Sequence, residues 1–591
     1  MSLIDELKRR KVFKVGAAYL VAAWLTIQAA SIAFPTFEAP AWALRVLIFV
    51  VLLGFPFALM LAWMIELTPE GVKVERAGVG SKRMAATASV LAALAIAWYY
   101  LGAPAVRNVG AAERSIAVLP FVNMSGDAEN EYFSDGISEE ILNVLAQTQG
   151  LKVAARTSSF SYKGKSKEVP DIARELEVRM VLEGSVRKQG EKVRITAQLI
   201  DAAQGFHLWS KTYDRDLKDI FAIQDEIARE IGKQLQVELG GARGADGVAG
   251  TTDLQAHDLY LQGLSLFQQR GLENMHAADE KFRGALARDP KFAKAWGALS
   301  LVHSAMPNWD PTTDRIAGDR IRYDAAERQL ALDPTLPEGW LVLAVKAYDE
   351  ARYDTGNTLF ERTLGLAPSY AQAYQWYGEA LGAAGDIEGG LTQTRKGLAL
   401  DPKAMIYKLA VANQLVFLGR FDEAEQGYQA LVAEFPDQFR FYGGLANTDI
   451  QRGEPEKARQ NYRKLHELRG RNAASIAAAD RLIDGFAGKL SKGELDALAV
   501  KVAALPEPGT GSPDDPVVGT MIRLKLFLVA GHEDLAAPEL LRYAKLLPDV
   551  AATLYSAPIF DAYRCRPDWQ ALEKPLNVVD RRRATVCGGK S

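Results

Sequence analysis

The chain has 591 residues, more than one hydrophobic core can serve, so we expect several structural units. Its formal net charge of -3 at pH 7 excludes a global basic field that would attract the phosphate backbone of a nucleic acid. Two cysteines exclude a disulfide-rich scaffold, and the six histidines are scattered, with none in an HExxH metal-binding pattern.

The N-terminal part contains three apolar runs without a charge. They comprise residues 15–34, 46–65 (with one arginine just before it) and 84–101, and each is long enough to cross about 30 Å of hydrocarbon as a helix. We therefore predict a membrane anchor with three transmembrane helices over residues 1–107. A cleaved signal peptide is the alternative for the first run.

Basic residues indicate how such an anchor would be oriented. They precede the first run and lie between the second and the third, whereas the loop over residues 35–41 has none. Because basic loops stay in the cytoplasm, we expect a cytoplasmic N-terminus, an anchor in a bacterial inner membrane and periplasmic domains after it. The lipid bilayer is then one expected partner.

Residues 108–239 change to short alternating units typical of a small α/β domain. The apolar spacing predicts strands over 115–121, 151–156, 179–188, 191–200 and 206–214, and helices over 136–147, 170–178 and 220–236. Asp135 is the expected N-cap of the first helix, and Glu139 and Glu140 in its first turn suit the positive end of the helix dipole.

Several motifs of this region carry a resemblance to a known family. The stretches SIAVLPFVNMSGDAENEYFSDGISEEI, LKVAARTSSF and VLEGSVRKQGEKVRITAQLIDAAQGFHLWSKTYDRDL closely resemble the TolB-type amino-terminal domain of proteobacterial proteins that also carry tetratricopeptide repeats. Relatives frequently carry an adenylate cyclase or winged-helix module ahead of this domain, and we find neither in this sequence. The resemblance implies a fold and an envelope setting but does not indicate a particular activity.

Beyond a glycine-rich linker at residues 240–252, the chain becomes periodic. Pro334, Pro368, Pro402 and Pro436 follow one another at intervals of 34 residues, the tetratricopeptide period. A regular coiled coil is excluded, because prolines at this spacing would break it. We predict an all-α solenoid of five to six repeats over residues 253–470, followed by degenerate or capping helices and a tail over residues 471–591. The step of 44 residues from Pro290 to Pro334 predicts an insertion near residues 307–314.

Small and large residues recur at fixed phases of this period. A large residue that fills the space left by a small one is how stacked helix pairs share a core. The residues predicted to pack in this way are Trp340, Ala344, Phe360, Tyr374, Gly378, Ala412, Ala424, Tyr428, Tyr442, Ala446, Ala458 and Tyr462.

The two cysteines, Cys565 and Cys587, lie 22 residues apart in the last segment. A disulfide that closes this segment and two independent thiols are equally compatible with the sequence. An oxidising compartment would be needed to keep the bond.

The expected function is binding. A solenoid presents a concave surface to extended peptides or helices, so we predict a periplasm-facing scaffold or adaptor that binds a protein partner through the repeat groove. The alternative is a sensory or regulatory subunit that couples a periplasmic state to a separate cytoplasmic effector. The sequence shows no nucleophile elbow, metal spacing, Rossmann fingerprint or carboxylate pair tied to a motif. We therefore expect no enzyme activity, cofactor, metal, small-molecule substrate or nucleic acid.

Overall fold

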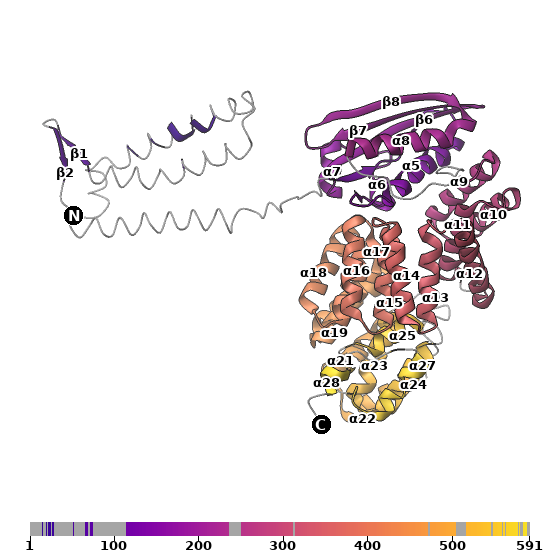
Figure 1. Ribbon diagram of the computed structural model, residues 1–591. Helices are drawn as coiled ribbons and strands as arrows, with labels where there is room; N and C mark the ends of the chain where they lie inside the picture. Colours follow the sequence, from indigo (N-terminus) through magenta and orange to yellow (C-terminus); the bar gives the residue numbers. More distant parts are fainter. Residues whose placement is uncertain are drawn as a thin grey trace. The chain divides into compact units, whose positions relative to one another are not determined.

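The computed structural model describes residues 114–235, 250–310, 314–470, 473–503 and 516–544 and most of residues 548–587. Of the N-terminal part it describes residues 65–68 and 71–74 and a few residues between 15 and 51. The chain forms two compact units, Met1–Gly110 and Ala111–Ser591. In the first unit, strands β1 (Ile65–Thr68) and β2 (Gly71–Val74) form an antiparallel hairpin, where we expected the end of an apolar helix and a loop (Figure 1).

The prediction of three transmembrane helices is contradicted. Among the residues that the structure describes, no helix is both long and apolar enough to cross a bilayer. Most of residues 15–34, 46–65 and 84–101 lies outside the described residues. The fold class is corrected to a small α/β region followed by a helical solenoid. The predicted location, an inner membrane with periplasmic domains, is contradicted by the same finding.

The second unit begins with the α/β domain, in which the predicted strands and helices follow one another in the predicted order, with β4 and α6 in addition. Its elements are β3 (Ser115–Val118), β4 (Val122–Asn123), α5 (Glu131–Ala146), β5 (Lys152–Val153), α6 (Arg156–Phe160), α7 (Val169–Leu176), β6 (Met180–Gln189), β7 (Lys192–Asp201), β8 (Phe206–Asp216) and α8 (Ile220–Leu235). The sheet order is β5-β3-β6-β7-β8, with β4 also paired to β6. Strands β3, β5 and β6 are parallel, and β6 to β8 form an antiparallel meander.

Two local predictions differ from the structure. Helix α5 begins at Glu131, so Asp135 lies inside it and binds Lys163 at 2.6 Å instead of capping the helix. The strand predicted over 151–156 ends at Val153, because the N–H of Ala155 donates to the carbonyl of Leu400 in the solenoid, 2.8 Å away. The short helix α6 begins directly after it and was not predicted.

Helices cover the two faces of the sheet unequally. Helices α5 and α8 lie on one face, where Ile116, Val118 and Ile195 belong to the main core. Helix α7 lies on the opposite face and packs with Ala117 and Val181. Successive strand residues therefore enter different cores, as the alternation of side chains along a strand requires.

Six helix pairs follow within residues 250–470, and all are described. They are α9 (Leu254–Gln269) with α10 (Leu272–Arg288), α11 (Ala293–Ala305) with α12 (Arg315–Leu332), α13 (Pro337–Asp349) with α14 (Tyr353–Leu366), α15 (Ala371–Ala383) with α16 (Ile387–Leu400), α17 (Met405–Phe417) with α18 (Phe421–Glu434), and α19 (Phe439–Arg452) with α20 (Pro455–Leu468). The periodic prolines stand in the turns between pairs. The extra residues of the 44-residue step lie between α11 and α12.

The residues predicted to pack between repeats lie as follows. Ala344, Phe360, Ala412, Ala424, Tyr428, Ala446 and Ala458 are buried, and Trp340, Tyr374, Tyr442 and Tyr462 are partly buried. A Cβ added to Gly378 would come within 2.4 Å of Thr394 Oγ1, so only glycine fits where α15 meets α16. Trp340 Nε1 also donates to the Pro334 carbonyl (2.9 Å), and Tyr374 Oη to the Pro368 carbonyl (3.2 Å). These aromatic residues therefore tie a first helix to the turn before it, which the sequence analysis missed.

The C-terminal helices form a second core against the solenoid. They comprise α21 (Ala473–Phe486), α22 (Lys492–Ala503), α23 (Pro516–Ala530), α24 (Glu533–Ala544), α25 (Pro548–Tyr555) and the short α26 (Pro567–Gln570), α27 (Glu573–Leu576) and α28 (Arg583–Cys587). Ile387 and Phe417 of the repeats contribute to this core, and α23 contacts α19 while α25 contacts α15. The Cα atoms of Cys565 and Cys587 are 5.6 Å apart, within bonding range, and the structure joins their sulfurs.

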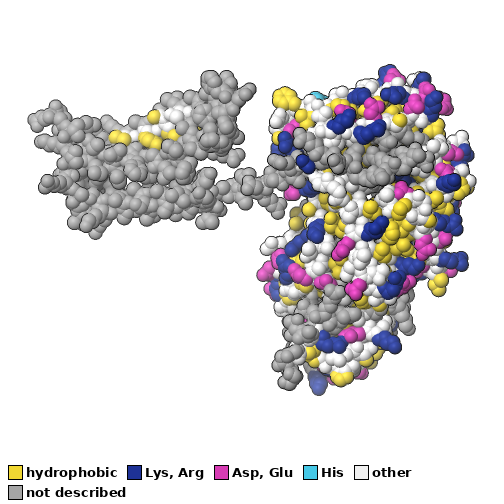
Figure 2. Space-filling model, in the orientation of Figure 1, with side chains coloured by type: hydrophobic (Ala, Val, Ile, Leu, Met, Phe, Trp, Pro, Cys, Tyr) yellow, Lys and Arg dark blue, Asp and Glu magenta, His cyan; other side chains and the backbone are white. Residues whose placement is uncertain are grey.

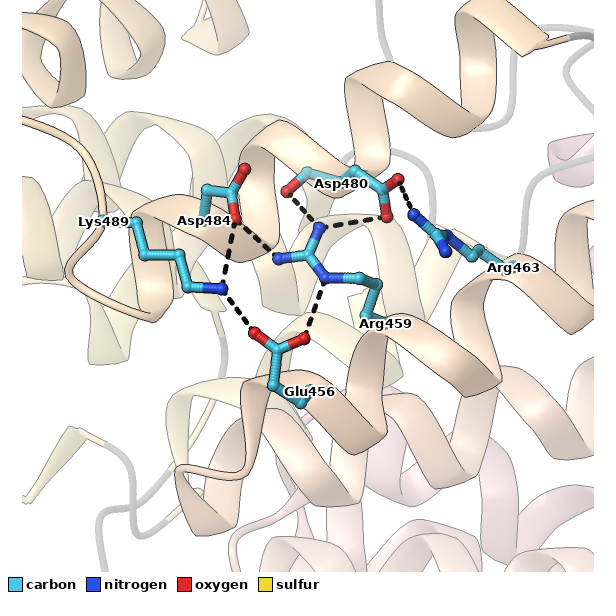
Figure 3. A network of polar contacts seen from close by, with 6 residues as sticks. All are labelled: Glu456, Arg459, Arg463, Asp480, Asp484 and Lys489. Atoms are coloured by element: carbon cyan, nitrogen blue, oxygen red, sulfur yellow. Dashed lines mark hydrogen bonds and ion pairs between the residues drawn. The ribbon is translucent and has the colours of Figure 1, made fainter.

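A polar network joins the last repeat to the first C-terminal helix (Figure 3). Arg459 of α20 lies between two carboxylates of α21, with Nη2 2.6 Å from Asp484 Oδ1 and Nη1 3.1 Å from Asp480 Oδ1. Its Nη1 also donates to the Asp480 carbonyl (3.1 Å). A second arginine of α20, Arg463, places its Nη2 atom 2.7 Å from Asp480 Oδ2. Arg459 and Arg463 thus fasten α21 to the end of the array, and Arg459 makes most of the contacts.

Replacing Arg459 with alanine should lower the free energy of unfolding by about 1 to 2 kcal/mol. Asp480 and Asp484 lose the cation that they share, and the backbone carbonyl of Asp480 loses its hydrogen-bond donor. Lys489→Ala is the control: it removes an exposed cation of the same network and should change stability by less than about 0.5 kcal/mol. Urea denaturation followed by circular dichroism measures both. Equal effects of the two substitutions would contradict the central role of Arg459.

Candidate functional site at the contact of the two domains

The α/β domain contacts the solenoid through helix α9 and through turns that join successive repeats. Lys294 follows the turn at Pro290, and Ser369 follows Pro368. Asp401 and Lys403 flank Pro402. The prolines that set the repeat period therefore also mark the edge of the solenoid on which the α/β domain lies.

Ser369 joins the turn after α14 to the edge of the sheet. Its Oγ accepts a hydrogen bond from the N–H of Val153 (3.0 Å) and donates to the carbonyl of Leu151 (3.0 Å). Its own N–H donates to the carbonyl of Ala146 at the end of α5 (3.2 Å). This serine occupies the hydrogen-bonding positions that another strand would take beside β5.

Asp401 supplies the cap of helix α6 from the other domain. The residue at the N-terminus of α6, Ala155, has no side chain that could cap it. Asp401 Oδ1 accepts instead from the N–H of Ser158 (2.9 Å) and from its hydroxyl (2.5 Å). Burial raises the pKa of Asp401, and the hydrogen bonds from Ser158 oppose that rise. The solenoid thus completes a helix of the α/β domain.

Glu140 of α5 is the centre of the contact and is only 1 % exposed. Its carboxylate lies 2.9 Å from Nζ of Lys294 and 2.9 Å from Nε2 of His257, both in the solenoid. Gln224 Nε2 of α8 donates to it at 2.7 Å. Burial alone would raise the pKa of Glu140, but the charges and hydrogen bonds of Lys294 and His257 outweigh it and lower this pKa to about 2. The carboxylate is therefore ionised in the folded protein.

The neighbouring residue, Glu139, makes a second bridge between the domains. It accepts from Arg156 Nε at 2.8 Å and from Gln268 Nε2 of α9 at 3.1 Å. Helices α5 and α9 approach closely here, since a Cβ on Gly136 would lie 2.7 Å from Leu261 Cδ2. The two glutamates were expected to serve the helix dipole, but the longer α5 places them in its buried middle. Their position between Ile137 and Ile141, on the apolar stripe of the helix, was the available signal.

Charged side chains of both signs are scattered over the visible surface. On the face shown in Figure 2, the described lysine and arginine side chains are interspersed with aspartate and glutamate over the α/β domain and the solenoid. This face therefore carries no large field of one sign among its described residues.

One family matches the α/β domain. Residues 112–230 match the family described as "HilA/YgeH-like transcriptional regulator, second domain". The matched family is not the TolB-type domain that the sequence motifs resemble, so the TolB-type assignment is not supported.

The curated relative is an enzyme by its description. The chain is 41% identical over 251 residues to "Putative adenylate cyclase 3" of Rhizobium meliloti (strain 1021), and the match covers 41% of this chain and 42% of that protein. The chain thus spans less than half the length of this relative. The prediction that the protein is not an enzyme is contradicted by this finding.

The solved structures that are similar include tetratricopeptide repeat proteins. A thermophilic TPR protein of Thermus thermophilus is 18% identical, with a TM-score of 0.28, over 33% of this chain and 98% of that one. Yeast Tom70 is 16% identical (TM-score 0.31, 57% and 70% covered), and the human IFIT1 dimer with PPP-AAAA is 15% identical (TM-score 0.32, 56% and 79% covered). These TM-scores are low, so the repeat assignment relies on the 34-residue period and the helix pairs of the chain itself.

Proposed function

We propose that this protein is a regulatory scaffold that binds a protein partner through the first helices of its repeats, while the solenoid also holds the α/β domain. The ionised, buried Glu140 network supports the fixed placement of the α/β domain. The carboxylate of Glu140 on the α/β domain pairs with His257 and Lys294 on the solenoid. Few other arrangements of the two domains would keep these buried groups paired, so the contact fixes their relative position. A regulatory role is supported by the relative described as an adenylate cyclase.

One first helix, α17, leaves two apolar side chains exposed for such a partner. Ile406 and Met405 stand in the first turn of α17 and are 47 % and 37 % exposed. Exposed apolar side chains on a helix are the kind of anchor through which a partner peptide or helix is bound. We place the partner there.

A pull-down with purified full-length protein as bait tests this placement. The double variant Met405→Glu/Ile406→Glu should lose a partner that the wild type recovers. Ile316→Glu is the matched control, because Ile316 on the second helix α12 is 84 % exposed but lies away from α17. Recovery of the same proteins by all three baits would contradict the proposal.

A second candidate is nucleotide cyclisation, and the curated relative favours it. Formation of cyclic AMP from ATP by the purified full chain with Mg²⁺ would support this function. A chain that binds its partner but forms no cyclic AMP would restrict the function to scaffolding.

A further inference from the structure

The sheet of the α/β domain has two edges, and the described residues close only one of them. At the β5 edge, Ser369 of the solenoid makes the hydrogen bonds of a further strand, with the N–H of Val153 and the carbonyl of Leu151. At the other edge, β8 pairs only with β7 among the described residues, and it lies on the side of the sheet away from the solenoid (Figure 1). A strand of 11 residues is a long edge to leave unpaired.

The hydrogen-bond pattern shows which backbone groups of β8 face outward. The N–H of Leu217, directly after β8, donates to the carbonyl of Glu191 (2.7 Å), so these two residues form a hydrogen-bonded pair. Hydrogen-bonded and non-hydrogen-bonded pairs alternate along an antiparallel ladder, and the register from Trp209 to Asp216 is regular. The odd-numbered residues of this stretch therefore bond to β7. The residues that direct their N–H and C=O groups to the open edge are Ser210, Thr212 and Asp214.

The side chains of β8 leave this edge accessible to a further strand. Proteins commonly protect an open edge with a proline, a bulge or unpaired charges. Strand β8 contains no proline, and its register shift lies at its start, beside Leu199 and Ile200 of β7. Its charged side chains are already paired within the domain. The pairs are Lys211 and Arg215 with Glu226 of α8, Asp214 with Arg194, and Asp216 with Lys192.

Charge distinguishes the registers in which a second copy of β8 can pair with the first. A two-fold axis perpendicular to the sheet makes the two strands antiparallel and keeps equivalent faces on the same side. An axis at Lys211 places this lysine opposite its own copy, and an axis two residues later places it opposite Arg215. An axis at Thr212 places Ser210 opposite Asp214 and brings no like charges together. Because like charges directly opposite each other are destabilising, the register at Thr212 is favoured over the other two.

We propose that two copies of this protein associate through β8 in this register, so that their two sheets become one continuous sheet. Thr212 pairs with Thr212 of the second copy, and Ser210 pairs with Asp214 on either side of the axis, which gives about six backbone hydrogen bonds. A second copy suits this edge, since a two-fold interface uses the same surface on both subunits and the strand is complementary to itself. This inference is independent of the partner surface on α17.

Sedimentation velocity of the purified full chain, over about 0.1 to about 100 µM, tests the association. The wild type should be a dimer at the upper end of this range. Thr212→Pro should raise the dissociation constant at least about tenfold, because each copy loses the N–H at the centre of the interface. The N–H groups that bond to β7 stay in place, so the circular dichroism spectrum should not change. Thr212→Ala is the matched control: it removes the same side chain, keeps the N–H and should remain dimeric.

A second pair of variants tests the register without altering the backbone. Ser210→Asp places a carboxylate opposite Asp214 of the second copy and should weaken the dimer. Ser210→Lys places an ammonium group there and should leave the dimer at least as tight. Equal dissociation constants for these two variants would overturn the register.

Two results of the sedimentation experiment would overturn the association itself. One is a wild type that remains monomeric throughout, and the other is a Thr212→Pro dimer as tight as the wild type. In a monomeric wild type, slow hydrogen exchange of the outward N–H groups of β8 would assign the edge to another segment of the same chain. Fast exchange would leave the edge open to a different protein, and either result would exclude the second copy.

Discussion

Replacing Glu140 with alanine should lower the free energy of unfolding of the unit Ala111–Ser591 by about 3 to 5 kcal/mol, the effect of removing one partner from a buried ion pair. The substitution leaves the ammonium of Lys294 without its buried carboxylate. His257 and Gln224 lose their acceptor at the same time. Because the carboxylate joins both domains, we also expect the α/β domain to separate from the solenoid before global unfolding.

Urea denaturation of the full chain measures the stability change, and limited proteolysis detects the separation of the domains. Glu388→Ala is the control, since Glu388 is 64 % exposed at the start of α16 and should change stability by less than about 0.5 kcal/mol. A Glu140→Ala protein as stable and as resistant to protease as this control would show that the network does not hold the domains together.

The same carboxylate predicts a dependence on pH. The pKa of Glu140 is about 2 in the folded chain and near its ordinary value of 4.5 when unfolded. A lowered pKa contributes stability that is complete above about pH 4.5 and is lost as the pH falls toward 2. The stability difference between the wild type and Glu140→Gln should therefore shrink over this range. A difference that stays constant from pH 6 to pH 3 would contradict the assignment.

Replacing Ala424 with tryptophan should cost about 1 to 3 kcal/mol or more, because the site has no space for a larger side chain. Ala424 is fully buried and packs with Ala412, Tyr428 and Leu431 between α17 and α18. Repeats are coupled mainly to their nearest neighbours, so the thermal transition should also broaden or split.

Differential scanning calorimetry of the full chain measures both the shift and the shape of the transition. Gln426→Trp is the matched control, because Gln426 lies on the same helix but is exposed. It should leave the transition unchanged. An unaltered transition for Ala424→Trp would remove this residue from the contact between helices.

The sequence by itself determined the elements whose signals are local. Residues 191–200 alternate in polarity, and the structure makes residues 192–201 strand β7. The 34-residue spacing of prolines determined the helix pairs, because a proline ends one helix and small residues at a fixed phase allow the next pair to stack. These signals depend on neighbours within a few residues, or on a repeat, so no distant contact is needed to read them.

The tertiary structure decided what depends on contacts between distant segments. The end of β5 and the formation of α6 depend on Leu400 and Asp401, more than 240 residues away in the chain. The role of Glu140 depends on His257 and Lys294, and the sequence around Glu140 gives no indication of either partner. Hydrophobicity alone was not sufficient to assign the N-terminal runs as transmembrane helices. An apolar run indicates that burial is favourable, but it does not specify whether lipid or protein surrounds it. A local sequence pattern therefore specifies a helix or a strand, whereas the pairing of a buried charge with its partner is specified only by contacts between distant segments.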